Sequence, residues 1–179
     1  MDDKLILEQF RNEETRNYAF NLLVRQYQKR LYWHIRKILI DHDDTDDVLQ
    51  NVFIKVWRNL ENFKEESQLY SWLYRIATNE SINFLNQKKK RAGISFDDVS
   101  TFLANNLISD SYFKGDEIQI ILQKAILTLP DKQRIVFNMK YFDNIKYDEM
   151  SVILETSVGA LKASYHHAVK KIENYLAKR

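Results

Sequence analysis

Apolar side chains recur along most of the chain at intervals of three and four residues, the spacing that places them on one side of an α-helix. Near the C-terminus, Val158, Leu161, Tyr165, Ala168 and Ile172 follow this spacing. Clusters of Asp, Asn, Ser and Gly interrupt the period elsewhere. The pattern predicts helices at about 4–10, 14–40, 44–60, 67–90, 116–128, 130–142, 146–154 and 157–177.

The helical period lapses between residues 92 and 115. This stretch has Gly93 and Gly115 at its edges, is rich in Ser, Asp and Asn, and is more acidic than either flank. It is too long for an ordinary connection between helices, so a functional linker is the better interpretation. We therefore expect two small helical domains, 1–91 and 116–179, joined by a flexible linker at 92–115.

Composition supports an all-α fold. The chain has 179 residues, 45% of them hydrophobic, which suffices for a real core. Three glycines and one proline leave few tight turns for a β-rich fold. No cysteine is present to form disulfides or thiolate metal sites. The opening MDDKLILEQF is too charged for a signal peptide, and no apolar run of about 18 residues predicts a membrane span. We expect a cytoplasmic protein.

The net charge is only +2, but its distribution is uneven. Residues 156–179 carry five basic groups against Glu173 alone. A second basic run, residues 88–91, closes the predicted helix 67–90, where cations also suit the C-terminal end of the helix dipole. Solvated helix ends give the same pattern, so these runs alone do not establish an anionic partner.

The segment 147–169 has the pattern of a helix-turn-helix. A short amphipathic helix, YDEMSVIL, is followed by the turn ETS and by a longer helix for which Ser157 is a natural N-cap. The side of that helix opposite its apolar stripe is small at first and then polar or cationic: Ser157, Gly159, Ala160, Lys162, Ala163, His166, His167 and Lys170.

Small residues at the start of such a helix leave room to approach the floor of the DNA major groove. Lys162 and His166 would then reach base edges, and Lys170 with Lys171 would suit phosphates. Two-helix corners of ordinary bundles imitate this pattern. The adjacent histidines face different directions and would chelate poorly, so we expect no metal and no cofactor.

The acidic run DHDDTDD, residues 41–47, has neither the glycine nor the glutamate of a calcium-binding EF-hand loop. Helix-starting chemistry explains it better, with Asp43 or Asp44 as the cap and with Asp46 and Asp47 in the first turn. The helix that follows is expected to bury Val48, Val52, Val56 and Phe53. A polar strip on its other side is a candidate docking surface: Asp47, Gln50, Asn51 and Ile54.

A third segment, SQLYSWLYRIATNESINFLNQKKKR, combines aromatic, amide and basic residues. Leu69, Trp72, Leu73, Ile76 and Ala77 form the expected core face. Rings stack on unpaired bases and amides read base edges, so the other face is suited to single-stranded nucleic acid. An ordinary amphipathic helix with a solvated face would look the same. The residues expected to point outward are Tyr70, Tyr74, Arg75, Thr78, Asn79, Asn83 and Asn86.

Taken in order, these segments resemble the extracytoplasmic-function sigma factors, the promoter-specificity subunits of bacterial RNA polymerase. DDTDDVLQNVFIKVW is similar to the family's second conserved segment, SWLYRIATN to its promoter-melting segment, and LPDKQRIVFNMKYFDNIKYDEMSVILETSVGALKASYHHAVKKI to its fourth region. The resemblance covers nearly the whole chain. It implies two helical domains, no enzymatic activity, and binding to core RNA polymerase and promoter DNA.

The resemblance also implies roles for individual residues. The surface that docks on core polymerase corresponds to Asp44, Asp47, Gln50, Asn51 and Ile54. The loop and helix that hold the unpaired minus-ten strand correspond to Lys64, Tyr70, Tyr74, Arg75, Asn79 and Asn83. The helix that reads the minus-thirty-five element corresponds to Ser157, Gly159, Ala160, Lys162, Ala163, His166 and Lys170. An anti-sigma protein is implied as a further partner; a small-molecule substrate and direct membrane insertion are not.

The sequence departs from the family pattern in two places. The family's turn usually has glycine where Glu155 stands, and its recognition helix usually has arginines where Ser164, His167 and Val169 stand. Two other functions stay open: a self-sufficient helix-turn-helix regulator that binds duplex DNA as a dimer, and a helical protein-interaction adaptor. Hydrolytic and redox functions are excluded, because Cys, a Gly-rich phosphate loop and a Ser–His–Asp pattern are all lacking.

Overall fold

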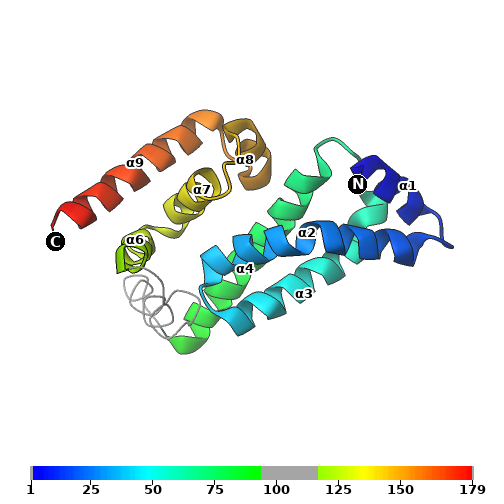
Figure 1. Ribbon diagram of the computed structural model, residues 1–179, viewed down its shortest axis with the longest axis horizontal. Helices are drawn as coiled ribbons and strands as arrows, with labels where there is room; N and C mark the ends of the chain where they lie inside the picture. Colours follow the sequence, from blue (N-terminus) through cyan, green and yellow to red (C-terminus); the bar gives the residue numbers. More distant parts are fainter. Residues whose placement is uncertain (1, 94–116, 179) are drawn as a thin grey trace.

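The computed structural model describes residues 2–93 and 117–178 (Figure 1). No strand occurs in these two ranges, so the all-α prediction is confirmed for them. The helices are α1 (Asp3–Arg11), α2 (Arg16–Leu39), α3 (His42–Asn59), the 3-10 helix η1 (Leu60–Asn62), α4 (Leu69–Ala92), α6 (Glu117–Leu127), α7 (Asp131–Tyr141), α8 (Tyr147–Leu154) and α9 (Val158–Ala177).

Helices α2, α3 and α4 pack against one another, and α1 packs on α2 (Figure 1). Their facing stripes bury residues such as Leu23, Leu31 and Val52 completely, and each such side chain contributes about 1.5–3 kcal/mol of transfer free energy. Asp3 fixes α1 to α2, because its carboxylate accepts hydrogen bonds of 2.8 Å from the Tyr27 hydroxyl and the Gln26 amide.

The C-terminal helices α6 to α9 form a second packed unit, in which α9 lies against α6, α7 and α8. The apolar stripe of α9 supplies its core residues. Leu161, Ala168 and Ile172 are buried, and Val158 and Tyr165 are partly buried, so the predicted stripe is confirmed. The Tyr165 ring stacks on Phe137 of α7 with a centroid separation of 5.8 Å.

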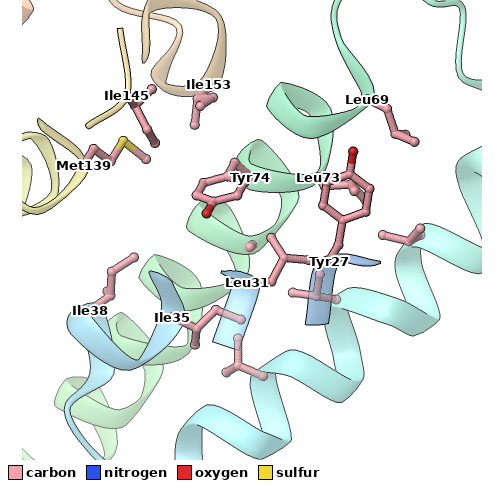
Figure 2. Close-up of a cluster of buried hydrophobic side chains, with 14 of the residues drawn as sticks. Tyr27, Leu31, Ile35, Ile38, Leu69, Leu73, Tyr74, Met139, Ile145 and Ile153 are labelled. Atoms are coloured by element: carbon pink, nitrogen blue, oxygen red, sulfur yellow. The ribbon is translucent and has the colours of Figure 1, made fainter. Parts of the chain in front are cut away.

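The N-terminal and C-terminal helices share one apolar cluster. Helix α8 packs against α4, and α7 packs against α2. Figure 2 shows Tyr74 of α4 with α2 side chains on one side and Met139, Ile145 and Ile153 of the C-terminal helices on the other. Apolar residues of α4 therefore contact partners from both ends of the chain.

The helix bounds agree with the predicted ranges to within two residues in the part of the chain that is described. Ser157 caps α9 as expected, its hydroxyl accepting from the Ala160 amide at 3.3 Å. The cap predicted for α3 was wrong. Asp41 caps that helix by accepting from the Asp44 amide at 2.9 Å, so Asp43 and Asp44 lie in the first turn and Asp46 beyond it.

Two further expectations concern connections and membranes. Pro130 is the N-cap of α7, so this helix begins one residue later than the predicted range 130–142. The expected linker at 92–115 lies outside the described residues except for the last residue of α4 and Gly93. Gly93 has φ +62°, the left-handed conformation that ends many helices. Among the described helices, none has the length and apolar character needed to cross a bilayer.

Candidate nucleic-acid interface

The outward side of α9 is open along its whole predicted strip. A methyl group added at Gly159 would meet no atom within 4 Å, so the fold itself does not demand a small residue there. The space is available to a partner. The predicted residues that are exposed are Ser157, Gly159, Ala160, Lys162, Ala163, His166 and Lys170.

Two lysines of this unit face one aromatic ring. The ammonium of Lys162 lies 5.8 Å from the centroid of the Tyr147 ring, and that of Lys140 lies 5.1 Å from it. Cation–π contacts of this kind hold a long flexible side chain near one position. At an exposed site such a contact is worth about 0.5–1 kcal/mol. Among residues 2–93 and 117–178, no group of three or more potential metal ligands occurs.

The polar strip on α3 is exposed at Asp47, Gln50, Asn51 and Ile54, and Ile54 keeps 42% of its surface accessible. Asp44 is different, because its carboxylate pairs with Lys88 of α4 and is mostly covered. Sequence reasoning missed Trp57, which follows Ile54 by three residues and is 37% exposed. That spacing continues the same strip, so the signal was present in the sequence.

The expected outward face of α4 divides into an open part and a covered part. Asn79 and Asn83 are exposed as predicted, and so is Lys64 in the preceding loop. Tyr70 and Arg75 are partly buried. For Tyr74 the expectation of an outward side chain was wrong, because only 3% of its surface is accessible.

Thr78 is also buried, which corrects its predicted outward position. Tyr74 shares an apolar cluster with α8, which packs on α4, while the Thr78 hydroxyl faces His34 of α2. Burial raises the pKa of the Tyr74 phenol above its ordinary value, with Tyr70 and Asp143 adding to the effect. Burial, with Glu149 and Asp143, also raises the pKa of Tyr70 to about 12.

A polar cluster lies beneath this cover. The His34 ring packs on the Tyr74 ring with a centroid separation of 4.7 Å, and the His34 Nε2 lies 2.8 Å from the Thr78 hydroxyl. The Thr78 hydroxyl donates to the Tyr74 carbonyl at 2.7 Å, so it accepts from His34, and Nε2 carries the proton of the neutral ring. The unprotonated Nδ1 then faces the Asp143 carboxylate at 3.9 Å. Sequence reasoning missed this cluster, because no local pattern relates residues so far apart.

The charges of the cluster are settled by burial and by ion pairing. Burial lowers the pKa of His34, and its carboxylate neighbour Asp143 offsets this only in part. Burial opposes ionisation of Asp143, but the Lys37 ammonium beside it outweighs burial and holds the pKa of that carboxyl below its ordinary value. The Lys37 ammonium donates to Asp143. At neutral pH the cluster therefore holds a neutral imidazole beside a Lys–Asp ion pair.

Two clefts open on the uncovered end of the α4 face. They have volumes of about 350 Å³ and 330 Å³ and share Phe63, Trp72 and Arg75 in their walls. Lys64 lines the first and Asn79 the second, while Val152 of α8 closes one side of the first. An aromatic wall beside cationic and amide groups suits an unstacked base and its phosphates.

The chain matches two parts of one family in order. Residues 23–91 match sigma-70 region 2, and residues 119–172 match sigma-70 region 4. The chain belongs to the sigma-70 family, in its extracytoplasmic-function group. As a sigma factor it is a non-catalytic subunit that binds core RNA polymerase and contacts promoter elements through regions 2 and 4. Region 2 runs from within α2 to the end of α4, and region 4 runs from α6 into α9.

Known proteins resemble this sigma factor over nearly its full length. The ECF RNA polymerase sigma-E factor of Escherichia coli (strain K12) is 29% identical over 97% of this chain and 94% of its own. The RNA polymerase sigma-H factor of Pseudomonas aeruginosa is 28% identical over 97% of this chain and 93% of its own.

Two solved structures share the fold. CnrH in complex with the cytosolic domain of CnrY matches with a TM-score of 0.71 and 21% identity over 98% of this chain and 97% of that one. The sigma factor RpoE from Bartonella quintana, in complex with the anti-sigma factor NepR, matches with a TM-score of 0.70 and 19% identity over 88% of this chain and 96% of that one.

Proposed function

We propose that α9 reads the minus-thirty-five element in duplex DNA. The observation that carries this proposal is the uninterrupted exposure of its small and cationic strip, with open space above Gly159. Lys162 and His166 lie four residues apart on one side, within reach of neighbouring base edges, and Lys170 lies further along, where phosphate contact is favoured. Ser157, Ala160 and Ala163 leave room for the groove floor.

The minus-ten strand, in this proposal, binds unpaired to the loop after η1 and to α4. Arg75 and Lys64 face its phosphates, Asn79 and Asn83 contact base edges, and Tyr70 and Tyr74 stack on bases once the cover of α8 is removed. Stacking of one base on an aromatic ring contributes about 1–3 kcal/mol. Binding of the separated strand at this surface would assist melting of the duplex.

Core polymerase docks, we infer, on the exposed α3 strip of Asp47, Gln50, Asn51 and Ile54. We add Trp57 to this surface because of its exposure and its position. Asp44 supports the surface from its edge, since its carboxylate is engaged by Lys88. A strip with an apolar centre and a polar rim has the composition of a protein interface.

The chain's division and regulation are part of the same proposal. We assign residues 1–91 and 116–179 to two domains joined at 92–115, in line with the separate region 2 and region 4 matches. We expect a cytoplasmic location, where core polymerase is found. We also propose an anti-sigma partner, since two sigma factors of the same fold were solved in complex with CnrY and NepR.

Co-purification with core polymerase tests the docking surface. The variant Gln50→Ala/Ile54→Lys should lose most of its binding to core polymerase, while its urea unfolding stays within about ±0.5 kcal/mol of the parent chain, as for most exposed substitutions. A matched control, Gln28→Ala/Tyr18→Lys, changes the same residue classes on the exposed side of α2. Equal binding by both variants would remove the α3 strip from the proposal.

A run-off transcription assay with the purified holoenzyme tests the function as a whole. Promoter-dependent initiation is expected only when core polymerase and the chain are both present. Because residues 156–179 are only modestly basic, the free chain should bind duplex promoter poorly at physiological salt. Tight sequence-specific binding by the free chain, with unchanged promoter preference in Lys162→Ala, would favour the self-sufficient regulator instead.

A further inference from the structure

The loop at residues 63–68 joins η1 to α4 and forms one wall of the larger cleft. Phe63, Lys64 and Ser67 line that cleft, and no residue of this η1–α4 loop belongs to a helix. Glu65 in the loop has φ 58°, the left-handed conformation that residues with a side chain rarely adopt. Such a residue persists only where its surroundings hold it. The contacts of Glu65 therefore bear on the shape of the cleft wall.

Arg11, the last residue of α1, holds Glu65 across a separation of 54 positions in the sequence. The Arg11 Nη2 donates to the Glu65 Oε1 at 2.8 Å. Both side chains are exposed, and ion pairs at the surface add little to folding stability. The effect of this pair falls instead on the conformation of the η1–α4 loop.

Arg16, the first residue of α2, reaches η1, which leads into the loop. The Arg16 Nη2 lies 3.2 Å from the Glu61 Oε2. The Arg16 Nε donates to the Phe10 carbonyl at 3.1 Å, and the guanidinium lies 5.2 Å from the centroid of the Phe10 ring. Two contacts with α1 thus fix this guanidinium, so it loses little side-chain freedom when it pairs with Glu61.

Helix α1 is itself held in place by the rest of the N-terminal unit. Phe10 is buried and meets the Trp57 ring edge-on with a centroid separation of 5.3 Å. The Thr15 hydroxyl donates to the Gln9 carbonyl at 2.7 Å, and α1 packs on both α2 and η1. Helix α1 and the start of α2 lie outside residues 23–91, which match sigma-70 region 2. A segment with no role in the proposed function therefore contacts both η1 and the loop after it.

We propose that Arg11 and Arg16 are positioning residues for recognition of the minus-ten strand. Through Glu65 and Glu61 they hold the η1–α4 loop in the shape that receives an unpaired base. Neither arginine lines either of the two clefts, and each has a carboxylate partner, so both act through the loop and not on the strand. This inference rests on the proposed function of the α4 face and extends it to α1.

The size of the effect follows from the loop's freedom before binding. A loop that already has its binding shape loses less conformational freedom when the strand binds. Loss of one exposed ion pair changes an equilibrium constant by up to about fivefold. We therefore expect Arg11→Gln to weaken strand binding by about threefold and Arg11→Gln/Arg16→Gln to weaken it by about tenfold.

A double-mutant cycle in the reconstituted holoenzyme tests the proposal. The variants are Arg11→Gln, Glu65→Gln and the two together. The matched control is Arg25→Gln, which removes an exposed guanidinium of α2. The probe is a fluorescein-labelled non-template strand that carries the minus-ten element of a promoter transcribed by the holoenzyme, and fluorescence anisotropy measures its affinity. Urea unfolding of Arg11→Gln should match that of the parent chain, which excludes misfolding as the cause.

Arg11→Gln should weaken binding about threefold in the parent background but less than about 1.5-fold when Glu65→Gln is already present, because its effect passes through Glu65. Arg25→Gln should stay within about 1.5-fold of the parent, as most exposed substitutions do. The preference for the native base should fall at one minus-ten position. The slope of log affinity against log salt concentration should not change, because no phosphate contact is lost. The pair Arg16→Gln and Glu61→Gln should behave in the same way.

Equal losses from Arg11→Gln in both backgrounds, or a slope that falls in magnitude by about one unit, would show a direct phosphate contact and overturn the proposal. A loss no larger than that of Arg25→Gln would overturn it as well. Asn79→Ala separates these results from failure of the proposed function. If Asn79→Ala weakens strand binding while the Arg11 cycle shows no coupling, only the positioning role is lost. If the parent holoenzyme shows no preference for the minus-ten sequence, the assignment of the α4 face fails.

Discussion

The two faces proposed to bind DNA, on α4 and on α9, differ in how far the sequence of their own helix determines which side chains are exposed. Helix α9 has one apolar stripe and one polar side, and every residue predicted to be exposed there is exposed. Helix α4 has apolar or aromatic residues on more than one side, and part of its expected outer face is covered by α8. A helix with two apolar sides has room for two sets of neighbours, so its sequence does not say which side stays open.

The largest expected contrast between the faces is in folding stability. Tyr74→Ala should lower the free energy of unfolding by about 3–5 kcal/mol, because it removes a buried ring. His166→Ala on the open side of α9 should change it by no more than about 0.5 kcal/mol. Urea unfolding followed by circular dichroism measures both. Equal losses would mean that the α4 face is as open as the α9 face.

Promoter selection by the holoenzyme distinguishes base contacts from phosphate contacts on α9. Lys162→Ala should relax the sequence preference at particular minus-thirty-five positions, by about 1–3 kcal/mol for each lost base contact. Lys170→Ala should weaken binding to all sequences alike, because it loses a phosphate contact. The slope of log K against log salt concentration should fall in magnitude by about one unit. Competition assays with single-base promoter variants at several salt concentrations separate the two. A uniform loss in Lys162→Ala would make Lys162 a phosphate ligand instead.

Strand opening tests the uncovered end of α4 without the stability change that Tyr74→Ala brings. Asn79→Ala should reduce permanganate reactivity at the minus-ten element, since one side-chain hydrogen bond to a base is worth about 1 kcal/mol. A pre-melted template should restore most of the transcription. If Asn79→Ala lowers transcription from the duplex template and from the pre-melted template equally, Asn79 acts at a step other than strand opening.

Acidification should weaken the cover on α4, and this effect is the smallest. The pKa of His34 is lowered from its ordinary 6.5 because burial disfavours the cation, so protonation favours forms in which His34 meets water. Neutral His34 contributes fully to the stability of the closed form above pH 6.5, and this contribution declines as the pH falls below 6.5. Asp143 has its pKa lowered from 3.8, so its contribution declines only in stronger acid.

The groups that face His34 are Asp143 and Lys37, with Tyr74 and Thr78 against the ring. The distance between spin labels at Asn21→Cys in α2 and Asn174→Cys in α9, measured at about pH 7.5 and 5.5, should therefore be longer at the lower pH. His34→Gln should abolish the difference. A shift toward the closed form in acid would mean that the attraction between Asp143 and a protonated His34 exceeds the cost of burial.

The sequence predicts local features of this molecule well and distant contacts poorly. The period of apolar residues locates the helices, and cap chemistry identifies Ser157 as the N-cap of α9. In residues 41–47 several acids have the same cap chemistry, so Asp41 was overlooked as the residue that caps α3. The contact of Asp143 with Lys37 and His34 joins residues from opposite ends of the chain, and no spacing rule relates them.

The exposure of Trp57 and the burial of Tyr74 illustrate the same limit from two sides. Trp57 continues the α3 strip at a helical spacing, yet a large ring suggests a core position when only composition is considered. Tyr74 and Thr78 follow an outward spacing on α4, yet tertiary packing places them inside. Burial on a helix depends on which other helices arrive, and this information is spread over the whole chain.

The apolar cluster shared by regions 2 and 4 makes the free energy of separating the two regions depend on temperature. Separating α8 from α4 exposes side chains such as Tyr74 and Ile153 to water, so opening carries a positive heat capacity change, as a small unfolding reaction does. Near room temperature the force that keeps the halves together is mainly the entropy of water, and it fades on cooling. The free energy of separating α8 from α4 should therefore follow a curve with temperature rather than a straight line.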